Sequence, residues 1–465
     1  PFIVRVTDSF GNSVQGETVE FDITNNPVGA TGQVMSQEIV QTDVSGEASS
    51  ILTLGTVAGA YSVTAAIGGV GSVTFTANAV AGSATDFEFN TIPSPQTAGQ
   101  QFSISIDATD SQGNIATGYS GPPSLTTGAG STPQASATFS SGQVTLDVSV
   151  SQAGTNQTIT ATDGSVTGTS NGFDVQSGGV DAVNSTVTAD PATLQAGNPS
   201  TVTTDLRDGS NNPVSGLTDS DFTVGLTGSA TAGTVSETAT EGIYAFTVDN
   251  SVAETISVTV AANGVTLADN PSITFTAADA ASLDILSGNN QTGTVSEALV
   301  NPLVVQISDQ FGNPVEGETV DFGIDQAPLG ASGQLLSTTT ATTDASGEAS
   351  TTLTLGDTPG IYTVDASSGS LTAVTFSAEA EIGAASQMAV LVQPSETTAG
   401  EVISPAPAVE VTDNIGNPVA GIDVTVSEQS GYAFDEGTLT VSTNASGIAS
   451  FGDLVIQTAD SYALV

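Results

Sequence analysis

The sequence predicts an all-β chain of tandem, immunoglobulin-like β-sandwich domains arranged end to end as an elongated rod. Three observations lead to this fold class. A turn motif recurs about every hundred residues, the composition suits short strands, and no segment shows sustained apolar spacing of three and four residues. Hydrophobic residues make up 38% of the chain and aromatic residues 5%, so any core must consist mainly of Val, Ile, Leu, Ala and Phe. With 465 residues, the chain is long enough for several domains.

The recurring motif is Asp-x-x-Gly-Asn, and one of its copies has Asn211 in place of Gly. The copies are Asp8–Asn12, Asp110–Asn114, Asp208–Asn212, Asp309–Asn313 and Asp413–Asn417. They begin 102, 98, 101 and 104 residues apart. A second marker is a Phe in a late strand-like run, at Phe75, Phe173, Phe275 and Phe376, with spacings of 98, 102 and 101 residues. One repeat therefore has the size of one immunoglobulin domain.

Each motif predicts a hairpin turn whose fourth residue has a positive φ. Gly accepts this backbone conformation freely, and Asn tolerates it better than other residues. The leading Asp can accept hydrogen bonds from the turn's own amides. Alternating segments such as Phe2–Thr7 and Val19–Ile23 flank the turn, which predicts strands with one buried face.

Two further patterns follow the motif, each in three of the five repeats. A second turn has the copies Asp43–Gly46, Asp344–Gly347 and Asn444–Gly447. Then comes Gly-x-Tyr-x-(Val or Phe), at Gly59–Val63, Gly242–Phe246 and Gly360–Val364. A Tyr at this point resembles the tyrosine corner, in which the hydroxyl bonds back to the chain at a strand entry. The second repeat has Gly154-Thr-Asn156 there instead, so its corner must be satisfied differently.

The spacing of the motifs predicts five domains joined by short connections without long Gly/Ser or Pro tracts. Their expected ranges are 1–80, 81–178, 179–277, 278–382 and 383–465. By comparison with the fourth repeat, the first is expected to lack its first strand and the fifth its last strand. The sequence is thus expected to be a stretch of a longer chain, or neighbouring molecules are expected to supply the missing strands.

Net charge excludes several classes of partner. The chain has 49 acidic residues against two basic ones, Arg5 and Arg207, and a formal net charge of −47. Such a surface repels nucleic acids and anionic membranes, and the segment shows no membrane-inserting stretch. We interpret the acidity as an adaptation to a saline or calcium-containing exterior. With no Cys, the compartment cannot be inferred from disulfides.

The order of the motifs resembles the bacterial immunoglobulin-like repeats of the invasin and intimin group. The pattern is Val-Thr-Asp-x-x-Gly-Asn-x-Val-x-Gly, then Thr-Asp-x-Ser-Gly-x-Ala, then Gly-x-Tyr-x-Val. It lies at Thr7–Gly16, Thr42–Ala48 and Gly59–Val63, at Ser308–Gly317, Thr343–Ala349 and Gly360–Val364, and at Thr412–Gly421 and Thr443–Ala449. The second and third repeats match in part. The resemblance implies this sandwich fold and a role as spacer in large bacterial surface adhesins and related exported proteins.

No catalytic constellation emerges from the sequence. Without Cys and His there is no Cys–His or Ser–His–Asp nucleophile, and without Lys there is no Schiff base. A glycosidase carboxylate pair remains, but the chain has no Trp to stack on sugars. We expect no enzyme, and we single out no catalytic, cofactor-binding or metal-binding residue.

Calcium at the domain junctions is left open, because carboxylates are plentiful and calcium would stiffen an acidic rod. The acids near the expected junctions are Asp86, Glu88, Asp279, Asp284, Glu379 and Glu381. Simple solvation is the alternative for these groups. The chain also contains four Asn-x-Ser/Thr sequons, at Asn156, Asn184, Asn290 and Asn444, for which turn formation is favoured over glycosylation.

The sequence thus predicts an extracellular or cell-surface structural segment, such as an adhesin stalk or surface fibre. An alternative is a self-assembling subunit of an extracellular filament, sheath or surface layer, with strand exchange between subunits. A third reading is a module that binds sugar or ice. The expected partners are other copies of the chain or adjacent domains of a longer one, and the sequence names no ligand.

Overall fold

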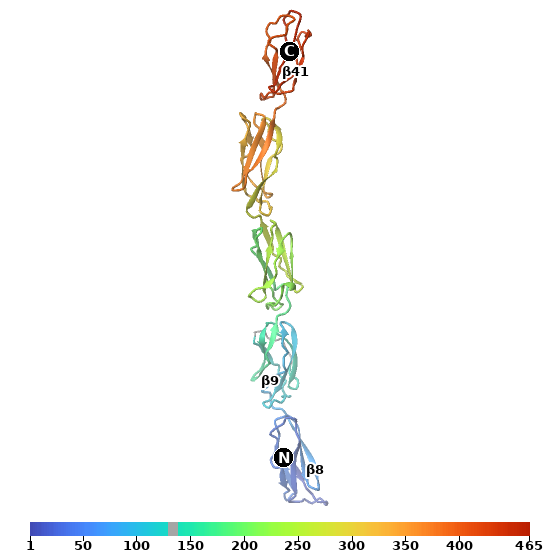
Figure 1. The fold of residues 1–465 in the computed structure, drawn as a ribbon. Helices are drawn as coiled ribbons and strands as arrows, with labels where there is room; N and C mark the ends of the chain where they lie inside the picture. Colours follow the sequence, from blue (N-terminus) through green and yellow to red (C-terminus); the bar gives the residue numbers. More distant parts are fainter. Residues whose placement is uncertain (129–137) are drawn as a thin grey trace.

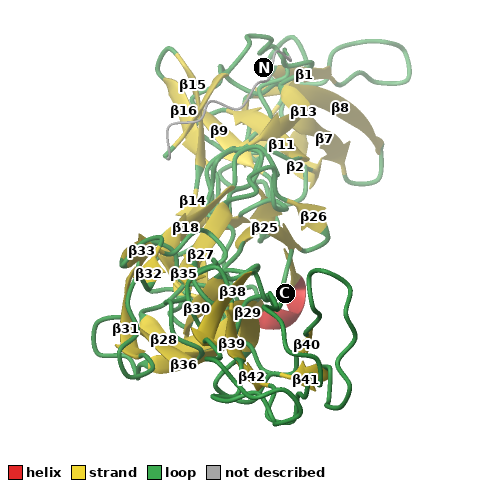
Figure 2. Ribbon diagram, turned by 90° about the horizontal axis from the view of Figure 1, so that it is seen from above, coloured by secondary structure: helices red, strands yellow, loops and turns green. Residues whose placement is uncertain are grey.

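The computed structural model describes residues 1–128 and 138–465 and shows five compact units strung in a line (Figure 1). Each unit has its own hydrophobic cluster, and every β-sheet lies within one unit. The predicted fold class, tandem immunoglobulin-like sandwiches arranged as a rod, is confirmed. Seen along the rod, the described chain is strand and loop with one 3₁₀ turn, η1 (Asp219–Asp221) (Figure 2). No helix within these described ranges is both long and apolar enough to span a membrane.

The first unit, from β1 to β8, places the sheet β4-β2-β7-β8 beside the pair β1-β5 and the short pair β3-β6. Alternation along β7 buries Tyr61, Val63 and Ala65, while the residues between them face outward. The strands are β1 (Phe2–Arg5), β2 (Thr18–Asn25), β3 (Val34–Met35), β4 (Ile39–Gln41), β5 (Glu47–Ser50), β6 (Leu52–Thr53), β7 (Gly59–Ile67) and β8 (Gly71–Ala79).

The second unit packs the sheet β12-β15-β16-β9-β11-β13 against β10-β17-β14. Phe87, Ile106 and Phe173 are among its buried core residues. The strands are β9 (Asp86–Phe89), β10 (Gln96–Thr97), β11 (Gln101–Thr109), β12 (Ser124–Thr127), β13 (Gln143–Ser149), β14 (Gly154–Gln157), β15 (Ile159–Asp163), β16 (Val166–Thr169) and β17 (Phe173–Gln176).

The third unit packs β18-β20-β24-β22 against β19-β27-β25-β21, with β23 and β26 added to β24 and β25. Every second residue of β25 is fully buried, from Ile256 to Ala262. The strands are β18 (Thr186–Asp190), β19 (Thr193–Gln195), β20 (Ser200–Asp205), β21 (Phe222–Leu226), β22 (Thr231–Ala232), β23 (Ser236–Glu237), β24 (Ile243–Asp249), β25 (Thr255–Ala262), β26 (Val265–Thr266) and β27 (Ser272–Thr276).

The fourth unit packs β28-β30-β34 against β29-β37-β36-β31-β33, and β32 pairs with β35. Val305 and Ile307 from the first sheet meet Phe322, Val364 and Phe376 from the second in one cluster. The strands are β28 (Ala280–Ser287), β29 (Gln291–Thr294), β30 (Leu303–Asp309), β31 (Thr319–Gln326), β32 (Leu335–Leu336), β33 (Thr340–Thr342), β34 (Glu348–Thr351), β35 (Leu353–Thr354), β36 (Gly360–Ser367) and β37 (Val374–Glu381).

The fifth unit contains the sheets β38-β39-β42 and β40-β41. Ala449, Phe451 and Leu454 form part of its core. The strands are β38 (Gln387–Val392), β39 (Ala408–Thr412), β40 (Asp423–Thr425), β41 (Thr440–Ser442) and β42 (Ile448–Ser450).

One expectation about the repeated turn needs correction. The turn itself is hairpin-like, closed in the first unit by a bridge between Thr7 and Ser13. However, the flanking strands β1 and β2 do not pair with each other: β1 pairs with β5, and β2 pairs with β4 and β7. The turn therefore carries the chain from one sheet of the sandwich to the other. Alternation predicts a buried face but not which neighbour pairs with it.

Candidate functional site at the junctions between units

The Asp-x-x-Gly-Asn segment forms the predicted turn. In the second unit, Asp110 Oδ1 accepts hydrogen bonds of 2.9 Å from the amides of Gln112 and Asn114. Gly113 N donates to Asp110 O at 2.9 Å. The fourth position is left-handed, with φ of 81° at Gly113 and 67° at Asn211. The predicted exchange of Gly for Asn at a positive φ is confirmed.

The second carboxylate oxygen of the same Asp holds the linker that enters the unit. Asp110 Oδ2 accepts a hydrogen bond from Gly82 N at 2.8 Å. Asp208 accepts one from Gly178 N at 2.7 Å, and Asp309 accepts one from Ala278 N at 2.8 Å. These three carboxylates are almost completely buried. One Asp thus fixes both the turn and the path of the linker.

The Asn that ends the motif reaches into the preceding unit. Asn114 Oδ1 accepts from Ala58 N at 2.8 Å, while Asn114 Nδ2 donates to Thr56 O at 3.0 Å. The other N–H of this amide points to the Asp110 carboxylate, with 3.1 Å between Nδ2 and Oδ2. Both N–H donors and the oxygen of the side-chain amide therefore make hydrogen bonds, and two of these bonds cross the junction.

The same pair of bonds recurs at the next two junctions. Asn212 accepts from Ala153 N at 2.9 Å and donates to Ser151 O at 2.7 Å. Asn313 accepts from Ala253 N at 2.9 Å and donates to Ser251 O at 2.8 Å. We call the Asp–Asn pair, with the linker amide and the preceding loop that it binds, the junction clamp.

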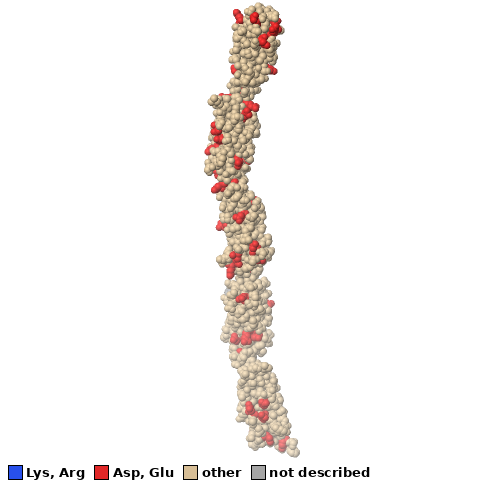
Figure 3. Space-filling model, viewed as in Figure 1, with Lys and Arg blue, Asp and Glu red and all other residues tan. Residues whose placement is uncertain are grey.

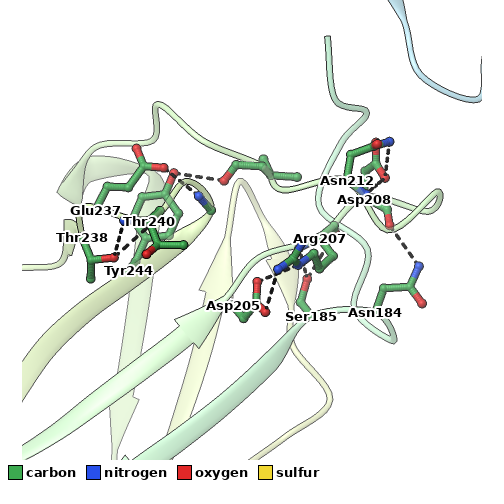
Figure 4. Close-up of polar contacts among 12 residues, drawn as sticks. Asn184, Ser185, Asp205, Arg207, Asp208, Asn212, Glu237, Thr238, Thr240 and Tyr244 are labelled. Carbon is green, nitrogen blue, oxygen red and sulfur yellow. Dashed lines mark hydrogen bonds and ion pairs between the residues drawn. The ribbon is translucent and has the colours of Figure 1, made fainter. Parts of the chain in front are cut away.

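Figure 4 shows the turn at the second junction, with the Asn212 amide beside the Asp208 carboxylate. Asn184 lies on the other side of the turn and donates from Nδ2 to Asp208 O at 2.9 Å. Next to it, Arg207 forms an ion pair of 2.7 Å with Asp205, the one salt bridge among the described residues. Apart from this ion pair, neutral and charge-assisted hydrogen bonds hold the region together.

A tyrosine supports the loop that the clamp grips. Tyr61 is fully buried and donates its hydroxyl hydrogen to Val57 O at 2.7 Å, in the middle of the loop that carries Thr56 and Ala58. Tyr362 makes the same bond to Thr358 O at 2.7 Å. The tyrosine corner predicted for these two repeats is confirmed. Its role is to hold the loop from inside while the next unit holds it from outside.

The third predicted corner, Gly242–Phe246, is wrong. Tyr244 lies on β24, which pairs with β20, whereas Tyr61 and Tyr362 lie on β7 and β36 of the other sheet. Its hydroxyl donates to Val214 O and accepts from Leu217 N, both at 3.1 Å. A three-residue pattern cannot show which sheet its strand joins.

The fifth unit has a corner that the pattern missed. Tyr462 donates to Thr458 O at 2.9 Å, four residues back, as Tyr61 and Tyr362 do. Asp460 stands where those repeats have Gly, so the fifth unit does not contain the Gly-x-Tyr pattern. In the second unit Asn156 replaces the tyrosine, and its backbone amide donates to Asp174 Oδ1 at 2.9 Å.

The clamp carboxylates are strongly stabilised as anions. Burial acts to raise the pKa of Asp110, but the hydrogen bonds from Gly82, Asn114 and Gln112 outweigh it and lower the pKa to about 2. The same balance lowers the pKa of Asp208, Asp309 and Asp413. At neutral pH each clamp therefore has a full negative charge that is satisfied by N–H donors.

The acids considered for calcium do not come together. Asp86 and Glu88 lie on β9, Asp284 on β28, and Glu379 and Glu381 on β37. Asp279 lies in a linker and accepts a hydrogen bond of 2.9 Å from Gln195 Nε2. Among the residues with described positions, no three acidic side chains are close enough to hold a metal ion. Calcium binding stays a hypothesis without a named site.

Two of the four sequon asparagines have structural roles. Asn184 bonds to the junction turn, as above. Asn444 Oδ1 accepts from Ser446 N at 2.9 Å and from Ile448 N at 3.1 Å, as Asp43 does in its sister turn. Asn290 lies in a turn and has a positive φ of 57°, as expected. Asn156, with a φ of 52°, lies instead on β14, where the pairing with β17 shifts register, so no turn forms at this sequon.

No protein-family model matches the chain, and no curated protein matches it in sequence. Solved structures do resemble it. The Escherichia coli adhesin FdeC is 23% identical, with 64% of this chain and 99% of that chain covered and a TM-score of 0.38. Invasin, described as a bacterial integrin-binding protein, is 15% identical, with 83% and 77% covered and a TM-score of 0.36. The D00-D0 domains of intimin are 14% identical, with 42% and 96% covered and a TM-score of 0.25.

The expected resemblance is confirmed. At these identities it concerns the fold alone. None of the three structures is described as an enzyme.

The cross-junction role of the Asn was not predicted from the sequence. Turn geometry needs the Asp and a residue tolerant of positive φ, yet the fifth position is Asn in all five copies. Because the turn alone does not require Asn at this position, its presence in all five copies could have indicated a second contact.

Proposed function

We propose that the chain is a stiff, extracellular spacer, the stalk of a surface adhesin or a surface fibre. Its role is to keep whatever it carries at a fixed distance, without catalysis. The observation that carries the proposal is the junction clamp, which ties each unit to the one before it by side-chain hydrogen bonds and so restricts bending. A spacer of flexibly linked domains would need no such bonds.

The proposal is tested by the shape of single molecules. Negative-stain microscopy and small-angle X-ray scattering are expected to show isolated, nearly straight rods. Replacing Asn114, Asn212 and Asn313 together by Ala should broaden the bend-angle distribution and shorten the mean end-to-end distance. Each unit should keep its own fold, because the three amides lie at junctions rather than inside the cores.

Asn12→Ala is the matched control. Asn12 belongs to the same motif, but its side-chain amide bonds within its own turn, where Nδ2 donates to Asp8 Oδ2 at 3.0 Å. This variant should leave the bend angles unchanged. Flexible wild-type chains would contradict the spacer function, and ordered polymers would favour the alternative of a self-assembling filament, sheath or surface layer.

The surface fits an extracellular or cell-surface location. Acidic side chains are spread over the units on the face seen in Figure 3, with no cluster of basic ones. A net charge of −47 disfavours binding to nucleic acids and keeps copies of the rod apart at low salt. Surface labelling of intact producing cells with an antibody against the rod would test the location.

We also propose that the five units are independently folding domains with the boundaries 1–80, 81–178, 179–277, 278–382 and 383–465. The separate hydrophobic clusters support this division. Limited proteolysis is expected to cut first near residues 81–83, 177–179, 277–279 and 381–383. Early cleavage inside a unit would argue against these limits.

A further inference from the structure

We propose that the rod has one built-in hinge, at the fourth junction, where a proline disables half of the junction clamp. The inference rests on the proposed spacer function and adds a place where the spacer bends. This junction lies between the units β28–β37 and β38–β42, the uppermost pair in Figure 1.

The loops that the clamps hold differ in sequence at the fourth junction. At the first three junctions these loops read Thr56-Val-Ala58, Ser151-Gln-Ala153 and Ser251-Val-Ala253, and the last Ala of each donates its N–H to the Asn of the next unit. The fourth loop reads Asp357-Thr-Pro359. Proline has no N–H, so Pro359 cannot make the corresponding bond.

The clamp at this junction is reduced accordingly. Asn417 Nδ2 still donates to Asp357 O at 2.9 Å and lies 3.0 Å from Asp413 Oδ2. Asn417 Oδ1, by contrast, accepts no hydrogen bond from any residue in the described ranges. The bond from Asn417 to Asp357 is the one hydrogen bond that joins these two units directly, over the parts of the chain that are described.

The linker contact is also longest here. The distance from Gly383 N to Asp413 Oδ2 is 3.3 Å, against 2.7 to 2.8 Å for the linker bonds of Asp110, Asp208 and Asp309. At 3.3 Å an N–H to carboxylate bond is well beyond its favoured length. Both parts of the clamp are therefore weakened at the same place.

The loop around Pro359 is otherwise unchanged, so the difference lies in the missing amide hydrogen. Gly59 and Gly360, which follow Ala58 and Pro359, have φ values of 139° and 136°. The tyrosine bonds to Val57 O and Thr358 O are both 2.7 Å. Pro359 therefore occupies the same backbone conformation as Ala58, but it cannot donate the hydrogen bond that Ala58 makes to the next unit.

The consequence is a difference in stiffness between junctions. One lost hydrogen bond changes the balance between straight and bent arrangements by roughly fivefold. The third junction has additional contacts between units and is expected to be the stiffest. Besides its full clamp, Gln195 Nε2 donates a hydrogen bond to Asp279 in the linker. The Phe311 ring also lies over Gly197, where a Cβ would come within 2.5 Å of Phe311 Cζ.

The absence of Cys allows a direct test, because introduced thiols are the only ones in the chain. Spin labels are placed on the full chain at equivalent exposed strand positions: Asn78 and Glu88 across the first junction, or Glu379 and Ala389 across the fourth. Double electron–electron resonance then gives the distance distribution at each junction. The distribution at the fourth junction should be the broader one.

Two exchanges test the cause. Pro359→Ala should narrow the distribution at the fourth junction, and Ala58→Pro should broaden that at the first. In an Asn417→Ala background, Pro359→Ala should have no effect, because the acceptor for the new N–H is gone. Narrow, equal distributions at both junctions, or no response to Pro359→Ala, would overturn the hinge and leave the spacer function intact. Broad distributions at both would overturn the spacer function itself.

Discussion

At the scale of single residues, the Asp and the Asn of the repeated motif each form two kinds of hydrogen bond, one within the turn and one to a segment outside it. Asp110 satisfies its own turn through one oxygen and the linker through the other. Asn114 bonds to that Asp and to the preceding unit. A buried carboxylate with no cation beside it is stable only because N–H donors surround it. Removing its charge should therefore weaken both the turn and the junction.

We expect Asp110→Asn to destabilise the chain by about 2 kcal/mol at neutral pH, because the amide would turn an N–H toward Gly82 N–H. The pKa of Asp110, about 2, lies below that of an unfolded Asp. The stability that the Asp110 carboxylate contributes is therefore complete above about pH 4 and is lost as the pH falls through about 2. Thermal unfolding of both proteins from pH 7 to pH 2 should show their difference shrinking in that window.

Asp43→Asn is the control for this series. Asp43 accepts turn bonds from Ser45 N and Glu47 N, and the sister turn of the fifth unit already has Asn444 in its place. Asp43→Asn should lower the stability of the chain far less than Asp110→Asn does at neutral pH. An equal cost would show that the linker and junction bonds add nothing to the turn.

At the scale of elements, the loop before β36 is packed from within by three oxygen atoms. A Cβ on Gly356 would lie 2.6 Å from the Tyr362 hydroxyl oxygen, 2.9 Å from Gln334 Oε1 and 3.0 Å from Ser332 O. Gly55 has the same surroundings in the first unit, with Gln33, Thr31 and Tyr61 at 2.7 to 2.9 Å. The loop that the next unit grips is therefore built around a glycine that no side chain can replace without movement.

Gly356→Ala should lower the stability of the fourth unit by about 2 to 3 kcal/mol, because the methyl group would displace the tyrosine hydroxyl or the Ser332 carbonyl. Gly323→Ala, on β31 of the same unit, is the control, since a Cβ there meets nothing within 4 Å. Chemical denaturation of the chain, followed for the fourth unit, should separate the two variants. Equal stability would mean that this loop is not tightly packed.

At the scale of the whole molecule, charge repulsion acts along the entire rod. The chain has 49 acidic and two basic residues, and one ion pair lies among the residues that the structure describes. Screening by salt shortens the reach of this repulsion, from about 30 Å at 0.01 M to about 3 Å at 1 M. Stability should depend on ionic strength more than on any single pair of charges.

The melting temperature is accordingly expected to rise as NaCl increases from about 0.01 M to about 1 M. Scanning calorimetry at constant pH measures it. A second series at fixed ionic strength, with calcium or with a chelator, separates screening from binding: a further rise with calcium would reveal a bound ion. A melting temperature that does not change with NaCl would argue against the adaptation to a saline exterior.

Features held by hydrogen bonds between residues close together in the sequence were predictable, and features that depend on distant residues were not. The turn at Asp110 and Gly113 was predictable because its bonds join residues at most four positions apart. Tyr61 and Tyr362 were predictable for the same reason. The corner predicted at Tyr244 was wrong because the motif does not determine which strands pair. The corner at Tyr462 was missed because the residue two positions before the tyrosine is Asp460 and not Gly.

The sequence by itself determined the repeat, the all-β class, the turns and the acidic surface, since each follows from composition or from residues close together in the chain. Only the tertiary structure decided what the motif is for. Asn114 and Ala58 are 56 residues apart, and the bond between them exists because the sandwich brings the end of one unit against the first turn of the next. For the same reason Pro359 reads as an ordinary loop residue in the sequence, and becomes a missing donor only when Asn417 is placed against it.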